Sequence, residues 1–166
     1  KYFAMTGWRL GWMLLPQRLA RAVDCLAGNF TICAPALSQH AGLAAFSAES
    51  RTELDGHVAR YRANRALLLD GLAQLGLTGI APVDGAFYAY VDVSRYTADS
   101  LEFCERLLAD TGVAIAPGID FDPVGGRTRV RFSFAGAGSQ ISEALDRMGR
   151  WLPAEHAGPD FSRGRP

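Results

Sequence analysis

The sequence predicts an α/β or α+β fold, because segments with helical periodicity alternate with short runs that are typical of strands. The strongest single observation is an amphipathic helix expected over residues 51–75 and stopped by Gly76. Its apolar stripe recurs every three or four residues and consists of Leu54, Val58, Tyr61, Leu68, Leu72 and Leu75. The second observation is residues 86–93, which are rich in aromatic and β-branched side chains and predict a strand.

The first fifty residues predict helices joined by irregular segments. Residues 1–9 are dense in aromatics and suggest a loop, whereas the apolar run 10–15, ended by Pro16, suggests a short buried strand. Helices are expected over 16–27 and 35–48, with an irregular link over 28–34 between them.

The second half of the chain predicts shorter elements. Asp99 and Glu102 resemble a capping box that opens a helix ending at Gly112. Short strands are expected over 113–116 and 127–134, and a last helix over 139–152. Residues 153–166 are rich in Gly, Pro and Arg, and we expect a disordered tail there.

Composition excludes several classes of function. Charge is balanced, with 17 basic and 17 acidic residues, so we expect neither a nucleic-acid partner nor an anionic membrane surface. No apolar run approaches the roughly 20 residues that span a bilayer. The histidines lack metal-ligand spacing, and we expect no metal site. The cysteines are widely spaced and suggest free thiols in a reducing compartment: Cys25, Cys33 and Cys104.

The sequence begins with Lys1, without an initiator methionine or a signal peptide. We therefore expect the chain to be a fragment of a longer polypeptide, with its function completed by residues outside it.

Lys1 and Arg9 are the first candidates for chemistry. A lysine amine forms a Schiff base with an aldehyde cofactor, and an arginine fork pairs well with phosphate. One lysine and one arginine on a short loop could thus hold both ends of one cofactor. Two such charges are also common on solvated surfaces, so the spacing alone leaves both interpretations open.

The sequence around these two residues resembles the active-site signature of class I/II (fold type I) pyridoxal-phosphate-dependent aminotransferases, of the aspartate-aminotransferase type. The matching residues are Lys1, Met5, Thr6, Gly7, Trp8, Arg9 and Gly11. The resemblance implies that Lys1 is catalytic and carries pyridoxal 5'-phosphate as a Schiff base. It also implies that Arg9 binds the cofactor phosphate.

Arg131 is the candidate for substrate binding. Arg127, Arg129 and Arg131 alternate along an expected strand, so they should project to one face, where solvated arginines are the simplest reading. Apolar residues follow Arg131, and a guanidinium in that setting could grip a carboxylate with two parallel hydrogen bonds. The family has an arginine in a similar Arg-x-Ser-x-Ala context, which implies that Arg131 binds the substrate α-carboxylate. The resemblance gives Arg127 and Arg129 no role.

Two further stretches resemble the family. Gly85-Ala86-Phe87-Tyr88 matches a strand that borders the substrate entrance, and residues 116–121 match a Pro-Gly-x-x-Phe turn. Phe87 is accordingly a candidate substrate contact, with a place in the core or at the rim as the alternative for Phe87 and Tyr88.

The segment from Asn29 to Gln39, which contains the link from Asn29 to Pro35, departs from many relatives, which carry Ser-Asn-Pro near this place. The resemblance implies that this link approaches a second subunit. Phe30 and Ile32 would be buried against that partner, or else fold back on the local core.

The resemblance covers residues 1–152 and predicts three parts. Residues 1–48 would end the large cofactor domain, residues 49–152 would form the small α+β domain entered by a long connecting helix, and 153–166 would be the tail. We expect transamination between an amino acid and a 2-oxo acid in a cytoplasmic homodimer, with the fragment alone inactive. The alternatives are a β-lyase of the same fold and the aminotransferase-like domain of a transcriptional regulator. Partners of the pyridine ring would lie upstream.

Overall fold

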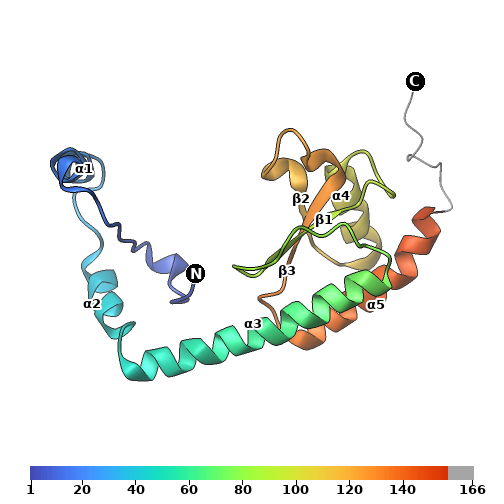
Figure 1. The fold of residues 1–166 in the computed structure, drawn as a ribbon, viewed down its shortest axis with the longest axis horizontal. Coiled ribbons are helices and arrows are strands. Elements are labelled where there is room, and N and C mark those ends of the chain that lie inside the picture. The colour runs from blue at the N-terminus through green and yellow to red at the C-terminus, as the bar shows by residue number, and fades with distance from the viewer. Residues whose placement is uncertain (157–166) are drawn as a thin grey trace. The chain divides into compact units, whose positions relative to one another are not determined.

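The computed structural model describes residues 1–156 of the chain. It divides into two compact units, Lys1–Ala59 and Arg60–Pro166. The elements in chain order (Figure 1) are η1 (Thr6–Trp8), α1 (Gln17–Phe30), α2 (Ala36–Ala44), α3 (Ala48–Gln74), β1 (Tyr88–Asp92), α4 (Ser100–Thr111), β2 (Ala116–Pro117), η2 (Gly118–Asp120), η3 (Gly126–Thr128), β3 (Arg129–Ser133) and α5 (Gly138–His156).

The first unit contains α1, α2 and the first turns of α3. Pro16 and Pro35 are the N-cap residues of α1 and α2, since proline has no backbone N–H and favours a helix start. Both expected helices are therefore confirmed, with shifted ends. Because α1 continues to Phe30, Asn29 and Phe30 belong to the helix, and the irregular link is shorter than expected.

The expected buried strand over residues 10–15 is wrong. The segment has no regular structure, and Leu14 and Trp12 are 88% and 74% exposed. A strand needs a neighbouring strand to satisfy its backbone hydrogen bonds, and residues 1–59 contain none. The apolar run is thus present without the partner that would make it a strand.

The long helix is confirmed over Ala48–Gln74. Its 27 residues span about 40 Å. Gly76, with a φ of 77°, stops the helix. The amides of Gly76 and Leu77 donate to the carbonyls of Ala73 and Leu72, which is the Schellman pattern. Leu54, Leu68 and Leu72 of the expected stripe are buried.

The second unit is built around a three-stranded antiparallel sheet in the order β1-β3-β2. Ala89 pairs with Phe132 and Val91 with Val130 in register, and these four side chains are buried. The alternate residues project from the opposite face, since strand side chains alternate. That second face carries Tyr88, Tyr90, Arg129 and Arg131.

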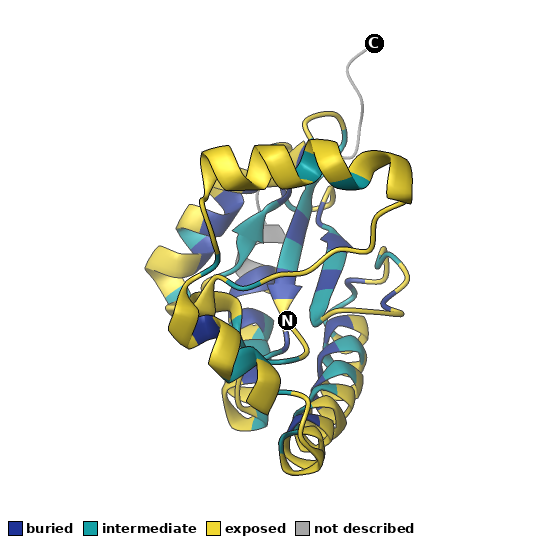
Figure 2. Cartoon of the chain, turned by 90° about the vertical axis from the view of Figure 1, so that its left-hand side faces the viewer, coloured by how far each residue is buried: buried dark blue, intermediate teal, exposed yellow. Residues whose placement is uncertain are grey.

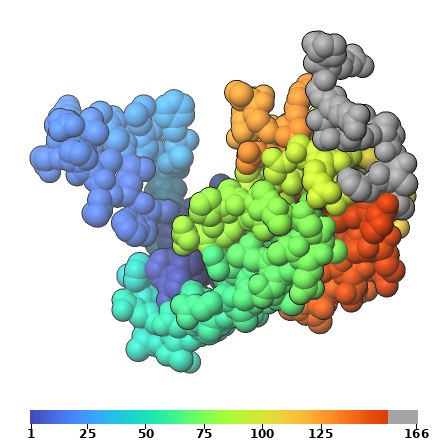
Figure 3. Space-filling view, turned by 45° about the vertical axis from the view of Figure 1, so that its right-hand side comes forward, coloured from blue at the N-terminus to red at the C-terminus, as the bar shows by residue number. Residues whose placement is uncertain are grey.

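The buried face of the sheet contributes to a core that also takes side chains from three helices. α3 supplies Leu68 and Leu72, and α4 supplies Phe103 and Leu107. α5 lies along the second half of α3 (Figure 1, Figure 3), where Leu145 packs directly on Gly71 and leaves no room for a side chain at that position. The helices therefore cover one face of the sheet, while the arginine-bearing face lies outside the core.

Two expected boundaries need correction. α5 continues through Pro153 to His156, beyond the expected end at residue 152, so the first residues of the expected tail are helical. Residues 157–166 lie outside the described part of the chain. Arg127 lies in η3 and not on β3, and its guanidinium is 3.8 Å from the Asp99 carboxylate. The three arginines consequently do not share one strand face.

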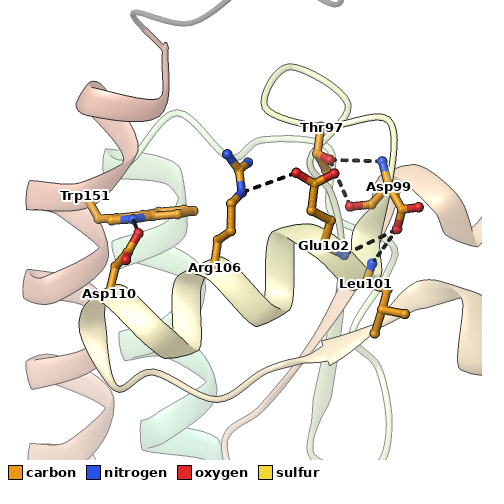
Figure 4. Close-up of polar contacts among 7 residues, drawn as sticks. All are labelled: Thr97, Asp99, Leu101, Glu102, Arg106, Asp110 and Trp151. Atoms are coloured by element: carbon orange, nitrogen blue, oxygen red, sulfur yellow. Dashed lines mark hydrogen bonds and ion pairs between the residues drawn. The ribbon is translucent and has the colours of Figure 1, made fainter.

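α4 begins and ends as the sequence predicts, with Asp99 as N-cap and Gly112 in the left-handed region as C-cap. The Asp99 carboxylate accepts hydrogen bonds from the amides of Leu101 and Glu102 (Figure 4). The reciprocal half of the expected capping box is absent, because the Asp99 amide donates to Thr97 Oγ1 at 2.9 Å. Glu102 instead lies 3.9 Å from Arg106 Nε. Such a cap typically stabilises a helix by about 1 kcal/mol.

Candidate active site

Lys1 and Arg9 line one pocket in the first unit. Its volume is about 580 Å³, and both residues reach it from the loop that precedes and follows η1. The wall is otherwise mainly apolar and consists of Phe3, Met5, Thr6, Leu10, Gly11, Trp12, Gly42, Ala45 and Phe46. The pocket thus combines an amine, a guanidinium and apolar walls, a combination that fits a small aromatic anion such as a phosphorylated pyridine.

Three contacts hold the loop that carries Lys1 and Arg9. The Tyr2 hydroxyl donates to Asp55 Oδ1 at 2.8 Å, and the Phe3 ring lies 5.0 Å from the Phe46 ring. Ser38, a buried residue of α2, donates its hydroxyl proton to the Trp8 carbonyl at 2.7 Å. The carbonyl fixed by Ser38 immediately precedes Arg9, so α2 sets the path of the chain into that residue.

Arg9 has a left-handed backbone, with a φ of 53°. A non-glycine residue in this region stores of order 1 kcal/mol of strain, which persists only where surrounding contacts impose it. Its guanidinium makes a long 3.4 Å hydrogen bond to the Thr6 carbonyl. The backbone turn therefore directs Arg9 to the pocket, and strain of this kind is concentrated at functional sites.

Arg131 and Phe87 belong to the second unit. Arg131 is half-buried on β3, and its Cζ lies 4.2 Å from the centre of the Tyr88 ring and 3.9 Å from that of Phe121. Phe87 packs against the edge of the core, with its ring centre 5.6 Å from Tyr61 and 4.6 Å from Tyr88. The four sequence-predicted site residues are thus divided between the units, with Lys1 and Arg9 together in the first.

Ser38 and Asn64 were not predicted from the sequence. Asn64 is 4% exposed, and its Nδ2 donates to the carbonyls of Phe134 and Gly136 at 2.9 and 2.8 Å. These bonds fix the chain as it leaves β3, just after Arg131. The position of Asn64 beside the apolar stripe of a helix could have indicated a buried polar residue. Its two hydrogen-bond partners lie 70 and 72 positions away and could not be deduced from the sequence.

Burial and hydrogen bonds shift the titration of several groups. Burial raises the pKa of the Cys104 thiol to about 11. The amides of Gly125 and Val124 hold the pKa of the Asp122 carboxyl below its usual value. The Asp55 hydrogen bond raises the pKa of Tyr2.

Within residues 1–156 no cluster of three or more His, Cys, Asp or Glu side chains is arranged to hold a metal ion. No described helix is both long and apolar enough to cross a membrane.

Comparison with known proteins gives consistent relatives. The valine–pyruvate aminotransferase of Mycobacterium tuberculosis is 63% identical over 155 residues, which are 93% of this chain and 40% of that protein. The aspartate/prephenate aminotransferase of Thermus thermophilus is 38% identical and is covered to 39%. The chain therefore spans about 40% of the length of these relatives.

Solved structures agree with the sequence relatives. An aminotransferase from Mycobacterium tuberculosis superposes with a TM-score of 0.91 at 63% identity, covering 93% of this chain and 40% of that one. An aromatic aminotransferase from Pyrococcus horikoshii has a TM-score of 0.85 at 30% identity, covering 93% and 41%. The model of the family "Aminotransferase class I and II" matches residues 1–148, which include the whole Lys1–Arg9 signature and Arg131. The chain therefore belongs to the class I and II aminotransferase family and forms part of its α/β, type I fold.

Proposed function

We propose that the intact protein is a pyridoxal-phosphate-dependent aminotransferase that moves an amino group between an amino acid and a 2-oxo acid. The single observation that carries the proposal is the presence of Lys1 and Arg9 in one pocket, in a chain that belongs to this family. The 63% identical relative makes valine and pyruvate the first substrate pair to test. Because the relatives are longer, the activity is assigned to the whole protein and not to these residues by themselves.

The pocket suits pyridoxal 5'-phosphate at both of its ends. When bound, this cofactor supplies an aldehyde and an electron-withdrawing ring, which make the substrate α-hydrogen acidic. Lys1 Nζ would hold the cofactor through its aldehyde and would serve as the base that moves a proton at the substrate α-carbon. Arg9 would pair with the phosphate, because its side chain lines the same pocket as Lys1.

Arg131 binds the substrate α-carboxylate in this proposal, which the Arg-x-Ser-x-Ala context shared with the family supports. Its half-buried position strengthens a charge-assisted pair relative to one in water. Phe87 borders the substrate entrance, where its partly buried ring would limit the size of the amino-acid side chain.

We further propose a domain division at the start of the long helix. Residues 1–48 complete a large cofactor domain, and residues 49–152 are the small domain. Phe30 and Ile32 are 83% and 82% exposed, so neither folds back on the local core. Their exposure supports burial against a second subunit in a homodimer, which light scattering of the intact protein tests. Free thiols favour a reducing compartment, and we place the protein in the cytoplasm.

Borohydride reduction of the intact protein, followed by peptide mapping, tests the central assignment. The pyridoxyl group should be found on Lys1, and label on any other lysine would refute the role of this residue. Lys1→Ala should lower transamination of valine with pyruvate by at least about a hundredfold, since it removes the proton carrier. Release of pyruvate from a β-substituted amino acid, without an oxo-acid acceptor and in place of transamination, would identify a β-lyase instead.

A further inference from the structure

The guanidinium of Arg131 lies against two aromatic rings. Its Cζ is 4.2 Å from the centre of Tyr88 and 3.9 Å from the centre of Phe121. The strand order β1-β3-β2 explains the arrangement, because β1 carries Tyr88 on one side of β3 and the segment after β2 carries Phe121 on the other. The two rings therefore reach Arg131 from opposite neighbours in the sheet.

This contact leaves the hydrogen-bond donors of Arg131 available. A ring face attracts a cation through its negative centre, and a planar guanidinium stacks on it with the N–H groups pointing outward in the plane. Among residues 1–156, no hydrogen bond or ion pair to the Arg131 guanidinium is seen. The two rings thus contact the Arg131 guanidinium, while its N–H donors remain available to a ligand.

We propose that Tyr88 and Phe121 are positioning residues that fix the plane of the Arg131 guanidinium for two-pronged binding of the substrate carboxylate. The inference rests on the proposed function, in which Arg131 binds that carboxylate. A long arginine side chain loses rotamer freedom when it pairs with a ligand. The Tyr88 and Phe121 rings, here called the aromatic clamp, remove part of that freedom before the ligand binds.

The segment that carries Phe121 is itself firmly held. Gly118 and Gly126 touch backbone to backbone, and a Cβ on either would collide with the other. Asp122 Oδ1 accepts hydrogen bonds from the amides of Val124 and Gly125 at 2.9 and 3.0 Å. The Phe121 amide donates to the Gly118 carbonyl at 3.0 Å. The Pro-Gly-x-x-Phe turn therefore presents an ordered ring to Arg131.

Tyr88 is held by the register of the sheet. It pairs with Ser133, two residues beyond Arg131 on the same face of β3, which places it diagonally opposite the arginine. Since the contact uses the ring face, phenylalanine should serve at this position as well as tyrosine.

The test uses the intact, cofactor-loaded protein. Phe121→Leu and Tyr88→Leu should each raise the KM for the amino acid by about threefold to thirtyfold, the range expected for a lost cation–π contact, with kcat nearly unchanged. Tyr88→Phe and Phe121→Tyr should retain the normal KM. The control is Tyr96→Leu, which removes a partly buried ring that packs on the core near Phe103 and should leave KM unchanged.

Double variants separate a clamp from a direct contact. In an Arg131→Ala background, Phe121→Leu should cause no further rise in KM, and a rise as large as in the wild-type background would overturn the clamp. A fall in kcat together with the unfolding temperature in both leucine variants would indicate a structural role and also overturn it. If Arg131→Ala raises KM but both leucine variants do not, the clamp alone is wrong. An unchanged KM in Arg131→Ala would refute the carboxylate role beneath it.

Discussion

The two units of the chain bury their apolar side chains to very different extents. Leu54 is the one hydrophobic residue of the described part of Lys1–Ala59 that is buried, whereas the second unit encloses a continuous core. Figure 2 shows α1 almost entirely in the colour of exposed residues. Trp12, Met13 and Leu14 are likewise exposed. The unit that carries the candidate cofactor site thus has almost no buried core among its described residues, while the unit that carries Arg131 encloses its own core.

The largest expected effect concerns independent folding. A piece spanning residues 48–166 keeps α3 whole and contains the complete core, so it should unfold in one cooperative thermal transition followed by circular dichroism. A piece spanning residues 1–47 should show no such transition, because it has almost no buried apolar surface to offset chain entropy. A cooperative transition in the piece spanning residues 1–47 would show that both units fold independently and would contradict the difference proposed between them.

The next effect compares the two arginines in the intact protein. Arg9→Ala should weaken retention of pyridoxal phosphate by about tenfold to a hundredfold, since a phosphate loses a charge-assisted partner. Arg131→Ala should spare the cofactor and raise the KM for amino acids, and lysine at this position should restore little, because an ammonium has no planar fork. Arg18→Ala and Arg129→Ala are the matched controls. Loss of cofactor from both site variants alike would show that the two arginines do not have separate roles.

Asn64 offers a smaller effect within the closed unit. Asn64→Ala leaves two backbone carbonyls without their donor and should lower the free energy of unfolding by about 2–3 kcal/mol. Asn29→Ala removes an exposed hydrogen bond to the Cys25 carbonyl and should cost well under about 1 kcal/mol. Chemical denaturation of both variants measures the difference, and equal losses would show that burial of Asn64 is energetically unimportant.

The smallest effect is alkaline. The folded state holds the Cys104 thiol protonated, because burial raises its pKa from 9.0 to about 11. The associated stability is complete below pH 9 and is lost as the pH rises toward 11, where the unfolded thiol ionises first. Cys104→Ala should therefore show a shallower fall in unfolding free energy over this window. In the native wild-type protein Cys104 should also resist alkylation until it is unfolded, as peptide mapping can verify.

Local signals made much of the fold predictable. The start of α4 at Asp99, its end at Gly112 and the stop of α3 at Gly76 each depend on groups within a few positions. Aromatic and β-branched composition similarly identified β1, and the strand expected over residues 127–134 contains β3. For the site, the Lys1–Gly11 signature and the context of Arg131 were sufficient to name the family, which the comparisons confirm.

Contacts between distant residues decided the rest. Residues 10–15 have the composition of a strand, but only a neighbouring strand could have made them one. The Asp99 amide donates its hydrogen bond to Thr97 Oγ1, whereas the capping-box pattern predicted Glu102 as the acceptor. Asn64 meets carbonyls 70 and 72 positions away.

The surroundings of Arg131 show the same division most clearly. By itself the sequence determined that an arginine stands in a strand followed by apolar residues. Only the order β1-β3-β2 brought Tyr88 and Phe121, which lie 43 and 10 positions before Arg131 by the sequence numbering, to its guanidinium. Periodicity and caps report on a residue's immediate neighbours, whereas strand order and close backbone contacts depend on the free energy of the whole packed unit.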